Sequence, residues 1–472
     1  MAGSASLTPY QNLLGTAGVA AAQRLTGDSG NDVAPTSDIL VSADKFGGHP
    51  EMVSQVYVEQ ASVNGGPVKT HYHPAKNQSN LPYGTVQTPT NGATGTNVLG
   101  SGNSVIFNVQ TTGMQSLIKS IYFEMTIRNN NVAALTLCPS HLLLATSTSG
   151  KAGVQFYFNN NSSNALNYYG DLLYWNYVQR STWEQRKILA KDLHVDADTF
   201  SPTGITIAAG ATVRIRMELP SPVTHGGVLL PTSIFNSLNY TINWGTADPV
   251  VAGGGSKADL DVQNLTLILE PIIVSQSRLN SIVSTYKNGN ISLKVFDQQY
   301  ESQALVTPAP GSTLQYQLKN IRGIVSELSM LMYTSTGAVS DYYTSLIGQL
   351  ATGTGGDGTF QLTTQSGQNL ISNNQTQMGY LLRYQYWMNG YTSFHNTVSG
   401  KELFTFFFAP GGQKVVGNTG RFPGYQYLWQ NNLQFGIPVG GLAAGTYQTT
   451  FFAPRLMYLT FFPDGPRFEV AP

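Results

Sequence analysis

The chain has 472 residues, of which 41% are hydrophobic and only 11% are charged. A typical soluble domain carries roughly 25% charged residues, so much of this surface must be polar without being charged. The 25 basic and 25 acidic residues cancel, which leaves no net field to attract nucleic acid or an anionic membrane. The single cysteine, Cys138, excludes an intrachain disulfide and a cysteine-rich metal site.

Membrane and secretion signals are absent from the sequence pattern. No apolar run is long enough for a transmembrane helix, and the N-terminus lacks the basic and apolar regions of a signal peptide. We therefore expect a soluble protein made in the cytoplasm. The length allows two or three domains and a large buried core.

Residues 1–48 are rich in small and turn-forming residues and contain one candidate helix. Thr8 and Pro9 supply an N-cap and a proline at the first helical position. The segment has two basic and four acidic residues, so it lacks the basic arm that would neutralise packaged nucleic acid. It forms either a partly ordered terminus or a helix that docks on a neighbour or a membrane. The residues that could face inward or toward a membrane are Tyr10, Leu13, Leu14 and Val19.

From about residue 50 the sequence predicts mostly β-strands. Ile121, Phe123 and Met125 alternate with polar residues, and the segment around Ile215 shows the same pattern. One-sided alternation is typical of antiparallel sheets with one face in a core. Residues 166–193 differ, because their length and apolar spacing predict a helical insertion.

A connector lies just past the middle of the chain. Leu265, Leu267 and Leu269 alternate as in a strand, and beyond Pro271 the apolar spacing becomes helical. The turn sequence Lys-Asn-Gly-Asn follows. We predict a short linker helix at 274–289.

The second half of the chain repeats the first. The segment NSVIFNV at 103–109 matches STLQYQL at 312–318, a shift of 209 residues. Further matches follow in the same order, with slightly smaller shifts: Phe123 with Met330, Leu238 with Leu433, and Leu265 with Leu456. An ordered set of matches at nearly constant spacing indicates an internal duplication.

A duplicated unit of antiparallel strands with long insertions predicts an all-β protein of two tandem eight-stranded antiparallel jelly rolls. Helical insertions and the linker helix complete this double jelly roll. The expected organisation is an N-terminal arm at 1–48, a first jelly roll at 49–273, the linker helix at 274–289 and a second jelly roll at 290–472.

With this organisation the chain resembles the double jelly-roll major capsid proteins of tailless, membrane-containing phages of the tectivirus type, a lineage that includes the adenovirus hexon. The resemblance covers essentially the whole chain. It is carried by five segments: the small-residue helix at 8–22, the strands at 211–222 and 260–271, the linker helix near 275–286 and the last strand at 451–462.

The resemblance implies a structural protein, not an enzyme, with no cofactor. Three chains would form a homotrimeric, pseudo-hexagonal capsomer that tiles an icosahedral virus shell over an internal membrane. The implied partners are further copies of the chain, neighbouring capsomers, penton or minor capsid proteins, and the membrane through the arm. The implied location is the virion, assembled from protein made in the host cytoplasm, without sequence-specific binding of nucleic acid.

Three other interpretations stay open. A secreted two-domain β-sandwich that binds or cleaves polysaccharide would need converging aromatic residues, two carboxylates and normally a secretion signal. A trimeric viral spike or fibre would share the strands and the trimer, although fibres usually repeat short units many times. An outer-membrane barrel would need a signal peptide and lipid-facing alternation.

Short motifs in the sequence favour structural roles. The pattern GxGxxG at 353–358 lies between a helical and a strand-like segment, the reverse of a dinucleotide site, and so predicts a surface loop. His71 and His73 have a spacing that zinc can use, but no third ligand is evident. Cys138 lies near His141 in an apolar setting, which favours a buried structural thiol over a nucleophile.

Overall fold

The structure is a computed structural model. The residues that it describes are 71–74, 104–111, 117–180, 183–196, 199, 206–222, 230–272, 276–288, 292–306, 313–325, 327–346, 359–363, 369–374, 401, 403–407, 426–428, 433–438, 446–462 and 465–470.

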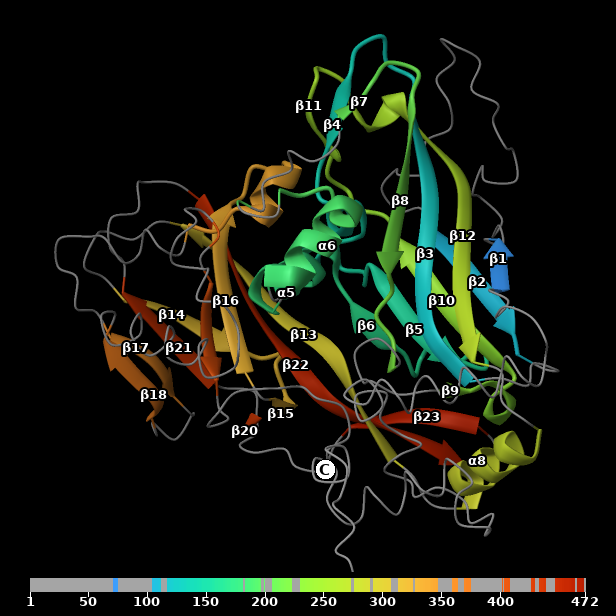
Figure 1. The fold of residues 1–472 in the computed structure, drawn as a ribbon. Coiled ribbons are helices and arrows are strands. Elements are labelled where there is room, and N and C mark those ends of the chain that lie inside the picture. Colours follow the sequence, from blue (N-terminus) through green and yellow to red (C-terminus); the bar gives the residue numbers. More distant parts are fainter. Residues whose placement is uncertain are drawn as a thin grey trace, which may run out of the picture.

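Eight strands of the first half form the main paths of two antiparallel sheets, four strands in each (Figure 1), and the short strand β9 (Leu230–Pro231) extends the first sheet by pairing with β3. One sheet has the order β1-β12-β3-β8 and the other β2-β10-β5-β6. Counted along the chain, the sheets join strands 1-8-3-6 and 2-7-4-5, the order of a jelly roll. These strands are β1 (His71–Pro74), β2 (Ser104–Gln110), β3 (Leu117–Asn129), β5 (Val154–Phe158), β6 (Leu166–Tyr168), β8 (Thr212–Glu218), β10 (Ser237–Asn243) and β12 (Leu260–Ile272).

The second half has the same topology. Its sheets contain the orders β13-β22-β16-β19 and β14-β21-β17-β18, which are again strands 1-8-3-6 and 2-7-4-5 of eight. The prediction of two tandem eight-stranded jelly rolls is therefore confirmed. The strands are β13 (Ser292–Val306), β14 (Thr313–Leu318), β16 (Glu327–Thr334), β17 (Thr359–Thr363), β18 (Asn369–Asn374), β19 (Phe404–Phe407), β21 (Leu433–Pro438) and β22 (Thr446–Phe462). Three strands extend the first of these sheets: β15 (Gly323–Val325), β20 (Gln426–Leu428) and β23 (Gly465–Val470).

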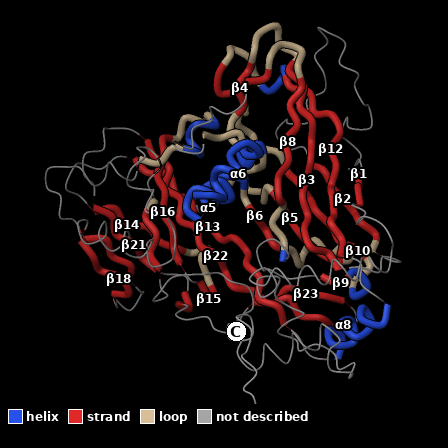
Figure 2. Tube along the Cα trace, viewed as in Figure 1, coloured by secondary structure: helices blue, strands red, loops and turns tan. Residues whose placement is uncertain are grey.

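Two helices, α5 (Gly170–Arg180) and α6 (Trp183–Leu193), fill most of the predicted helical insertion at 166–193. Its first three residues form strand β6 instead. In Figure 2 the helices lie between the strands of the two jelly rolls. The connections between the main strands also contain short strands and 3-10 helices. These are β4 (Leu135–Leu137), η2 (Ser140–Leu143), η3 (Ser147–Ser149), β7 (Thr206–Ile207), β9 (Leu230–Pro231), η4 (Thr232–Ile234), β11 (Val250–Ala252), η5 (Lys257–Asp259) and η6 (Val339–Tyr343).

The predicted linker helix is confirmed as α8 (Gln276–Asn288). Its apolar residues Leu279, Ile282 and Tyr286 are buried at a spacing that places them on one side of the helix. The Tyr286 ring meets the Phe461 ring edge to face, with centroids 4.9 Å apart, so the helix is packed onto the last long strand. The residue boundaries of the four predicted domains remain predictions.

The internal repeat is visible in strand register. In the first jelly roll Val109 pairs with Leu238, and in the second Leu318 pairs with Leu433, as the sequence matches predict. The match of Leu265 with Leu456 is out of register. In the first jelly roll Phe123 pairs with Leu267, and the predicted shift of Leu265 to Leu456 would place Leu267 on Tyr458. The residue that matches Phe123 in the second jelly roll, Met330, pairs instead with Phe451, which is seven residues before Tyr458. A break in register between Gln263 and Thr266 lies beside the mismatched position.

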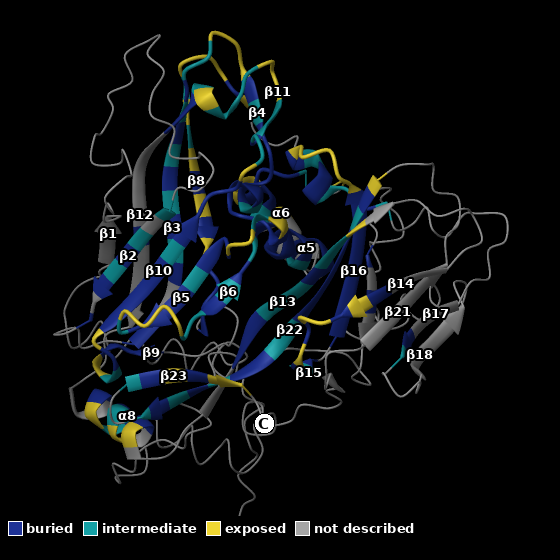
Figure 3. Ribbon diagram, turned by 180° about the vertical axis from the view of Figure 1, so that it is seen from behind, coloured by how far each residue is buried: buried dark blue, intermediate teal, exposed yellow. Residues whose placement is uncertain are grey.

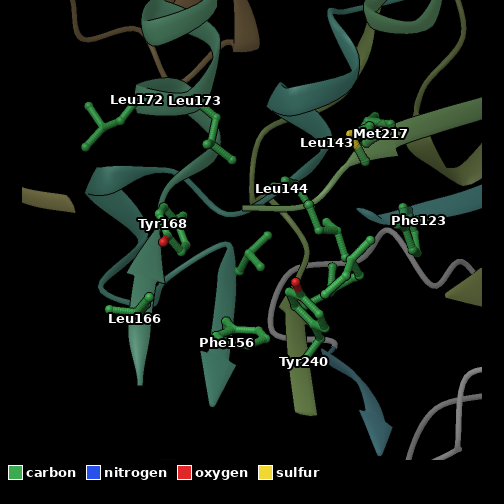
Figure 4. Packing of buried hydrophobic residues seen from close by; sticks show 14 of the residues in the cluster. Phe123, Leu143, Leu144, Phe156, Leu166, Tyr168, Leu172, Leu173, Met217 and Tyr240 are labelled. Atoms are coloured by element: carbon green, nitrogen blue, oxygen red, sulfur yellow. The ribbon is translucent and has the colours of Figure 1, made fainter. Parts of the chain in front are cut away.

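The core of the first jelly roll lies between its two sheets. On β3, Ile121, Phe123 and Met125 are buried and the residues between them are only partly so (Figure 3), which confirms the predicted alternation. Phe123 meets the rings of Phe107 and Trp244 at centroid distances of 6.1 and 6.2 Å. Figure 4 shows how aromatic and leucine side chains from strands, loops and α5 fill one continuous space.

Truncation of this core has a predictable cost. Phe123→Ala removes a fully buried ring that packs on Phe107 of the opposite sheet and on Trp244, so we expect it to lower the free energy of unfolding by about 3–5 kcal/mol. Val132→Ala is the control, because Val132 is 96% exposed and its truncation should change stability by less than about 0.5 kcal/mol. Urea denaturation followed by tryptophan fluorescence measures both, and equal values would contradict the assigned core.

Candidate functional site: the seam between the jelly rolls

The two jelly rolls meet along a surface that we call the seam. It joins β6, α5 and Asn164 of the first jelly roll to β13, β23, η6, Lys401 and Thr405 of the second. One hydrophobic core runs across it, because Phe156 and Trp175 belong to the same buried cluster as Tyr342 and Phe468. The two halves therefore share an interior.

Strand β6 is the edge of its sheet, and side chains of the other jelly roll cap that edge. Among the described strands β6 pairs only with β5, so its outer N–H groups need other acceptors. The N–H of Asn167 donates to Asp297 Oδ1 at 2.8 Å, and the N–H of Tyr169 donates to Gln298 Oε1 at 2.9 Å. The Tyr168 hydroxyl donates to the carbonyl of Phe296 at 2.9 Å. Three consecutive residues of β13 thus take the place of a neighbouring strand.

The capping is reciprocal. Strand β23 pairs only with β22 among the described strands, and the side chain of Asn164 occupies its other edge. Asn164 Nδ2 donates to the carbonyl of Phe468 at 2.8 Å, while the N–H of Phe468 donates to Asn164 Oδ1 at 2.7 Å. A primary amide can donate and accept side by side as a peptide group does, so one asparagine closes the edge from the first jelly roll.

Aromatic packing accompanies these hydrogen bonds. The Phe468 ring lies 6.1 Å from the Phe156 ring and 5.6 Å from the Phe158 ring, centroid to centroid. Tyr169 and Tyr300 meet edge to face at 4.6 Å. Such pairs contribute about 0.5–1.5 kcal/mol each beyond the burial of their area, so the seam combines a satisfied polar edge with apolar contact.

Helix α5 reaches the second jelly roll through three side chains. Trp175 Nε1 donates to the carbonyl of Tyr342 at 2.9 Å, and Gln179 Nε2 donates to Thr405 Oγ1 at 2.8 Å. Tyr174 accepts a hydrogen bond from Lys401 Nζ at 3.0 Å. The fully buried Trp175 therefore packs within the protein, and it does not form an exposed platform for a sugar.

The first turn of α5 is held by a buried carboxylate. Asp171 accepts hydrogen bonds from the N–H of Ser147 at 2.8 Å and from Ser147 Oγ at 2.5 Å. Burial raises the pKa of Asp171, and the Ser147 donors oppose this rise. An acidic side chain at a helix N-terminus is favourable because of the helix dipole, so Asp171 fixes the helix to the loop that carries Ser147.

Asp297 is the electrostatic centre of the seam. Its side chain is 4% exposed, and Asp297 Oδ2 lies 2.6 Å from Arg455 Nη2. Burial raises the pKa of Asp297 above its ordinary value, although Arg455 and the N–H of Asn167 pull it down. Because the folded pKa is the higher one, stability falls as the pH rises from the unfolded pKa through the folded pKa.

Lys401 is a buried cation whose contacts are to neutral groups. Besides Tyr174, its Nζ donates to the carbonyl of Tyr343 and lies over the Tyr343 ring at 4.8 Å from the centroid. Burial lowers the pKa of Lys401 to about 7. Among the described residues, aromatic faces and a backbone carbonyl stabilise whatever charge this amine carries.

Of the sequence motifs, His71, His73 and Cys138 lie in the described residues and take no part in the seam contacts above. Within the described ranges no group of three or more His, Cys, Asp or Glu side chains could hold a metal ion. His71 and His73 lie on β1, opposite Leu269 and Leu267 of β12. Cys138 is buried, and burial raises the pKa of its thiol, as expected for a structural cysteine. None of the described helices is both long and apolar enough to cross a membrane.

Two predictions concern residues that the structure does not describe. The GxGxxG segment at 353–358 lies outside the described residues. So do the four arm residues that could face inward or toward a membrane: Tyr10, Leu13, Leu14 and Val19.

Comparisons with known proteins identify the fold. No family model and no curated protein sequence matches the chain. Among solved structures, it is similar to the PBCV-1 virus capsid in a quasi-atomic model, with a TM-score of 0.56, 11% identity, and coverage of 86% of this chain and 97% of that one. The crystal structure of PBCV-1 VP54 fitted into a cryo-EM reconstruction of the virophage Sputnik has a TM-score of 0.55 and 12% identity, with coverage of 86% of this chain and 97% of that one. The cryo-EM structure of the Sputnik virophage itself has a TM-score of 0.51 and 11% identity, with coverage of 86% of this chain and 88% of that one.

At such low identity these similarities concern the fold alone. They agree with the strand order, which was established independently from hydrogen bonding. The chain has the fold of the double jelly-roll major capsid proteins, as the sequence resemblance implied.

The seam ion pair can be tested against a surface pair. Asp297→Asn leaves the partly buried Arg455 without its counterion, and we expect a loss of about 3 kcal/mol in unfolding free energy. Glu124→Gln makes the same chemical change in a pair with Arg214 and Arg216, whose side chains are 62% and 46% exposed, and should cost less than about 1 kcal/mol. Chemical denaturation measures both variants, and a smaller loss for Asp297→Asn than for Glu124→Gln would refute the importance of the seam pair.

Proposed function

We propose that this chain is a major capsid protein whose homotrimer forms a pseudo-hexagonal capsomer of an icosahedral virus. The observation that carries the proposal is the fusion of two jelly rolls of identical strand order through a buried, hydrogen-bonded seam. The shared fold with the PBCV-1 capsid structure supports it. The role is structural, and no catalytic step belongs to it.

The geometry of such a capsomer explains why the seam matters. Three chains with two similar units each present six similar units around one axis, which is close to hexagonal. That shape needs a fixed orientation between the two units of each chain. Edge capping by Asp297, Gln298 and Asn164 supplies a fixed contact, since each bond is directional and partly buried beside the apolar core that the two units share.

The composition fits repeated contact between copies. Acidic and basic residues balance at 25 each, so identical subunits can approach without strong repulsion. We place the protein in the virion, with neighbouring capsomers and penton or minor capsid proteins as partners and synthesis in the host cytoplasm. The expected domains are the arm at 1–48, jelly rolls at 49–273 and 290–472, and the linker helix between them.

Solution mass tests the trimer. Size-exclusion chromatography with light scattering should give three times the chain mass of 50.9 kDa, and negative-stain images should show a compact particle of hexagonal outline. A monomer at all accessible concentrations would contradict the capsomer. A long, thin trimer would instead support a fibre.

We also propose that the arm faces an internal membrane. Leu13 and Leu14 lie on the apolar side of the predicted helix at 8–22, and each would bury its side chain in lipid. The double variant Leu13→Asp with Leu14→Asp should reduce binding to phosphatidylcholine vesicles by at least about tenfold in a flotation assay.

The control for this experiment is Gln11→Asp with Asn12→Asp, which adds the same two charges at polar positions of the predicted helix without removing an apolar side chain. It should leave vesicle binding nearly unchanged. Equal loss in both double variants, or no binding by the unmodified protein, would contradict the membrane-facing arm while leaving the trimer untouched.

A further inference from the structure

His194 ends helix α6 in an unusual environment. It is 1% exposed, and its φ of 57° lies in the left-handed region, which is uncommon for residues other than Gly although Asn, Asp and His are enriched there. The backbone at this position therefore turns sharply after Leu193 and directs the imidazole inward against η2. Neither the fold nor the proposed capsid role requires a histidine here.

The hydrogen bonds define which imidazole nitrogen carries the proton. Ser140 Oγ donates its single hydrogen to the carbonyl of Asp192 at 2.8 Å. The contact of 2.9 Å between Ser140 Oγ and His194 Nδ1 must then run the other way, with Nδ1–H donating to Oγ. The remaining nitrogen, Nε2, is the unprotonated one. It is buried and has no hydrogen-bond partner within the described residues.

The surroundings of His194 offer no place for a second proton. Helix α6 packs against η2 and β8, and no carboxylate of the described residues accepts a hydrogen bond from either ring nitrogen. A proton on Nε2 would create a buried cation with an unpaired N–H group, which is costly. The titratable and charged residues on η2, α6 and β8 are His141, Glu184, Arg186, Lys187, Lys191, Asp192, Arg214, Arg216 and Glu218.

We propose that His194 is an acid-sensitive latch: protonation of its imidazole releases the C-terminal end of α6 from η2. Helix α6, which follows α5 of the seam, would then pack less tightly on the first jelly roll. The proton can be accommodated only when the imidazole reaches water, and this requires the end of α6 to move. The hydrogen bonds of Ser140 Oγ to the carbonyl of Asp192 and to His194 Nδ1 break in the same step.

The release would be local, because α5 is held by different groups. Its bonds from Trp175 to Tyr342 and from Gln179 to Thr405 involve no group that titrates between pH 4 and 7. Acid would therefore free the end of α6 while these two bonds still join α5 to the second jelly roll. A capsid with this device would become looser in an acidic compartment without falling into unfolded chains.

The direction of the effect follows from the folded and unfolded proton affinities. Burial lowers the pKa of His194 to about 4, against about 6.5 for a solvent-exposed histidine. The stabilisation of the docked α6 end by neutral His194 is complete above pH 6.5 and is lost as the pH falls toward 4. At pH 5 the equilibrium constant for release should be about 30-fold larger than at pH 7.5.

Hydrogen–deuterium exchange of the purified full chain tests the proposal. After correction for intrinsic exchange rates, protection of residues 183–194 should fall by about 30-fold between pH 7.5 and pH 5, while protection of β3 changes much less. The variant His194→Asn keeps a residue that tolerates positive φ and can bond to Ser140, but cannot titrate, so it should abolish this loss. His141→Gln, in the adjacent element, should retain it.

Each outcome decides the proposal. Equal acid loss of α6 protection in His194→Asn and the unmodified protein would overturn it, as would unchanged protection in the unmodified protein. Should His194→Asn fail to fold, the pH midpoint for the loss of α6 protection in the unmodified protein decides the proposal. A one-proton loss of protection confined to α6, with its midpoint between 4 and 6.5, supports the latch. A midpoint below 4, or a loss spread over all segments, contradicts it.

Discussion

The structure depends on the need of sheet edges for hydrogen-bond partners. A jelly roll is built from two open sheets, and each open sheet ends in strands whose outer N–H and C=O groups face no neighbour. Here the edges at the seam are closed by side chains of the opposite jelly roll. Asp297 and Gln298 serve β6, and Asn164 serves β23. The same bonds satisfy the edges and fix the two units to one another.

This requirement gives a physical reason for the unusual composition. Asparagine and glutamine can donate and accept at once without carrying charge, and so can close a peptide edge inside a core at little electrostatic cost. Tyrosine adds apolar area with one polar atom at its tip, as Tyr168 and Tyr342 do across the seam. A chain with only 11% charged residues is thus suited to polar contacts that are buried.

The sequence predicted what depends on local periodicity. Alternation in β3 and the repeat of β2 in β14 could be recognised, because each lies within one short segment. The last strands were matched seven residues out of register, because their true register is set by pairing with β3 and β16, which are far away in the sequence. The seam was not foreseen at all. Asn164 and Phe468 are 304 residues apart, and a single asparagine in a turn-rich segment has the same local pattern whether it caps an edge or faces water.

The central claim is that the seam makes two jelly rolls one cooperative unit, and differential scanning calorimetry tests it most directly. The account predicts a single transition for the full chain, with a calorimetric enthalpy equal to the van't Hoff enthalpy per folding unit. In Asn164→Ala, which removes the cap on β23, this transition should shift to lower temperature as a whole. Two separate transitions in the unmodified protein, one for each jelly roll, would contradict the account.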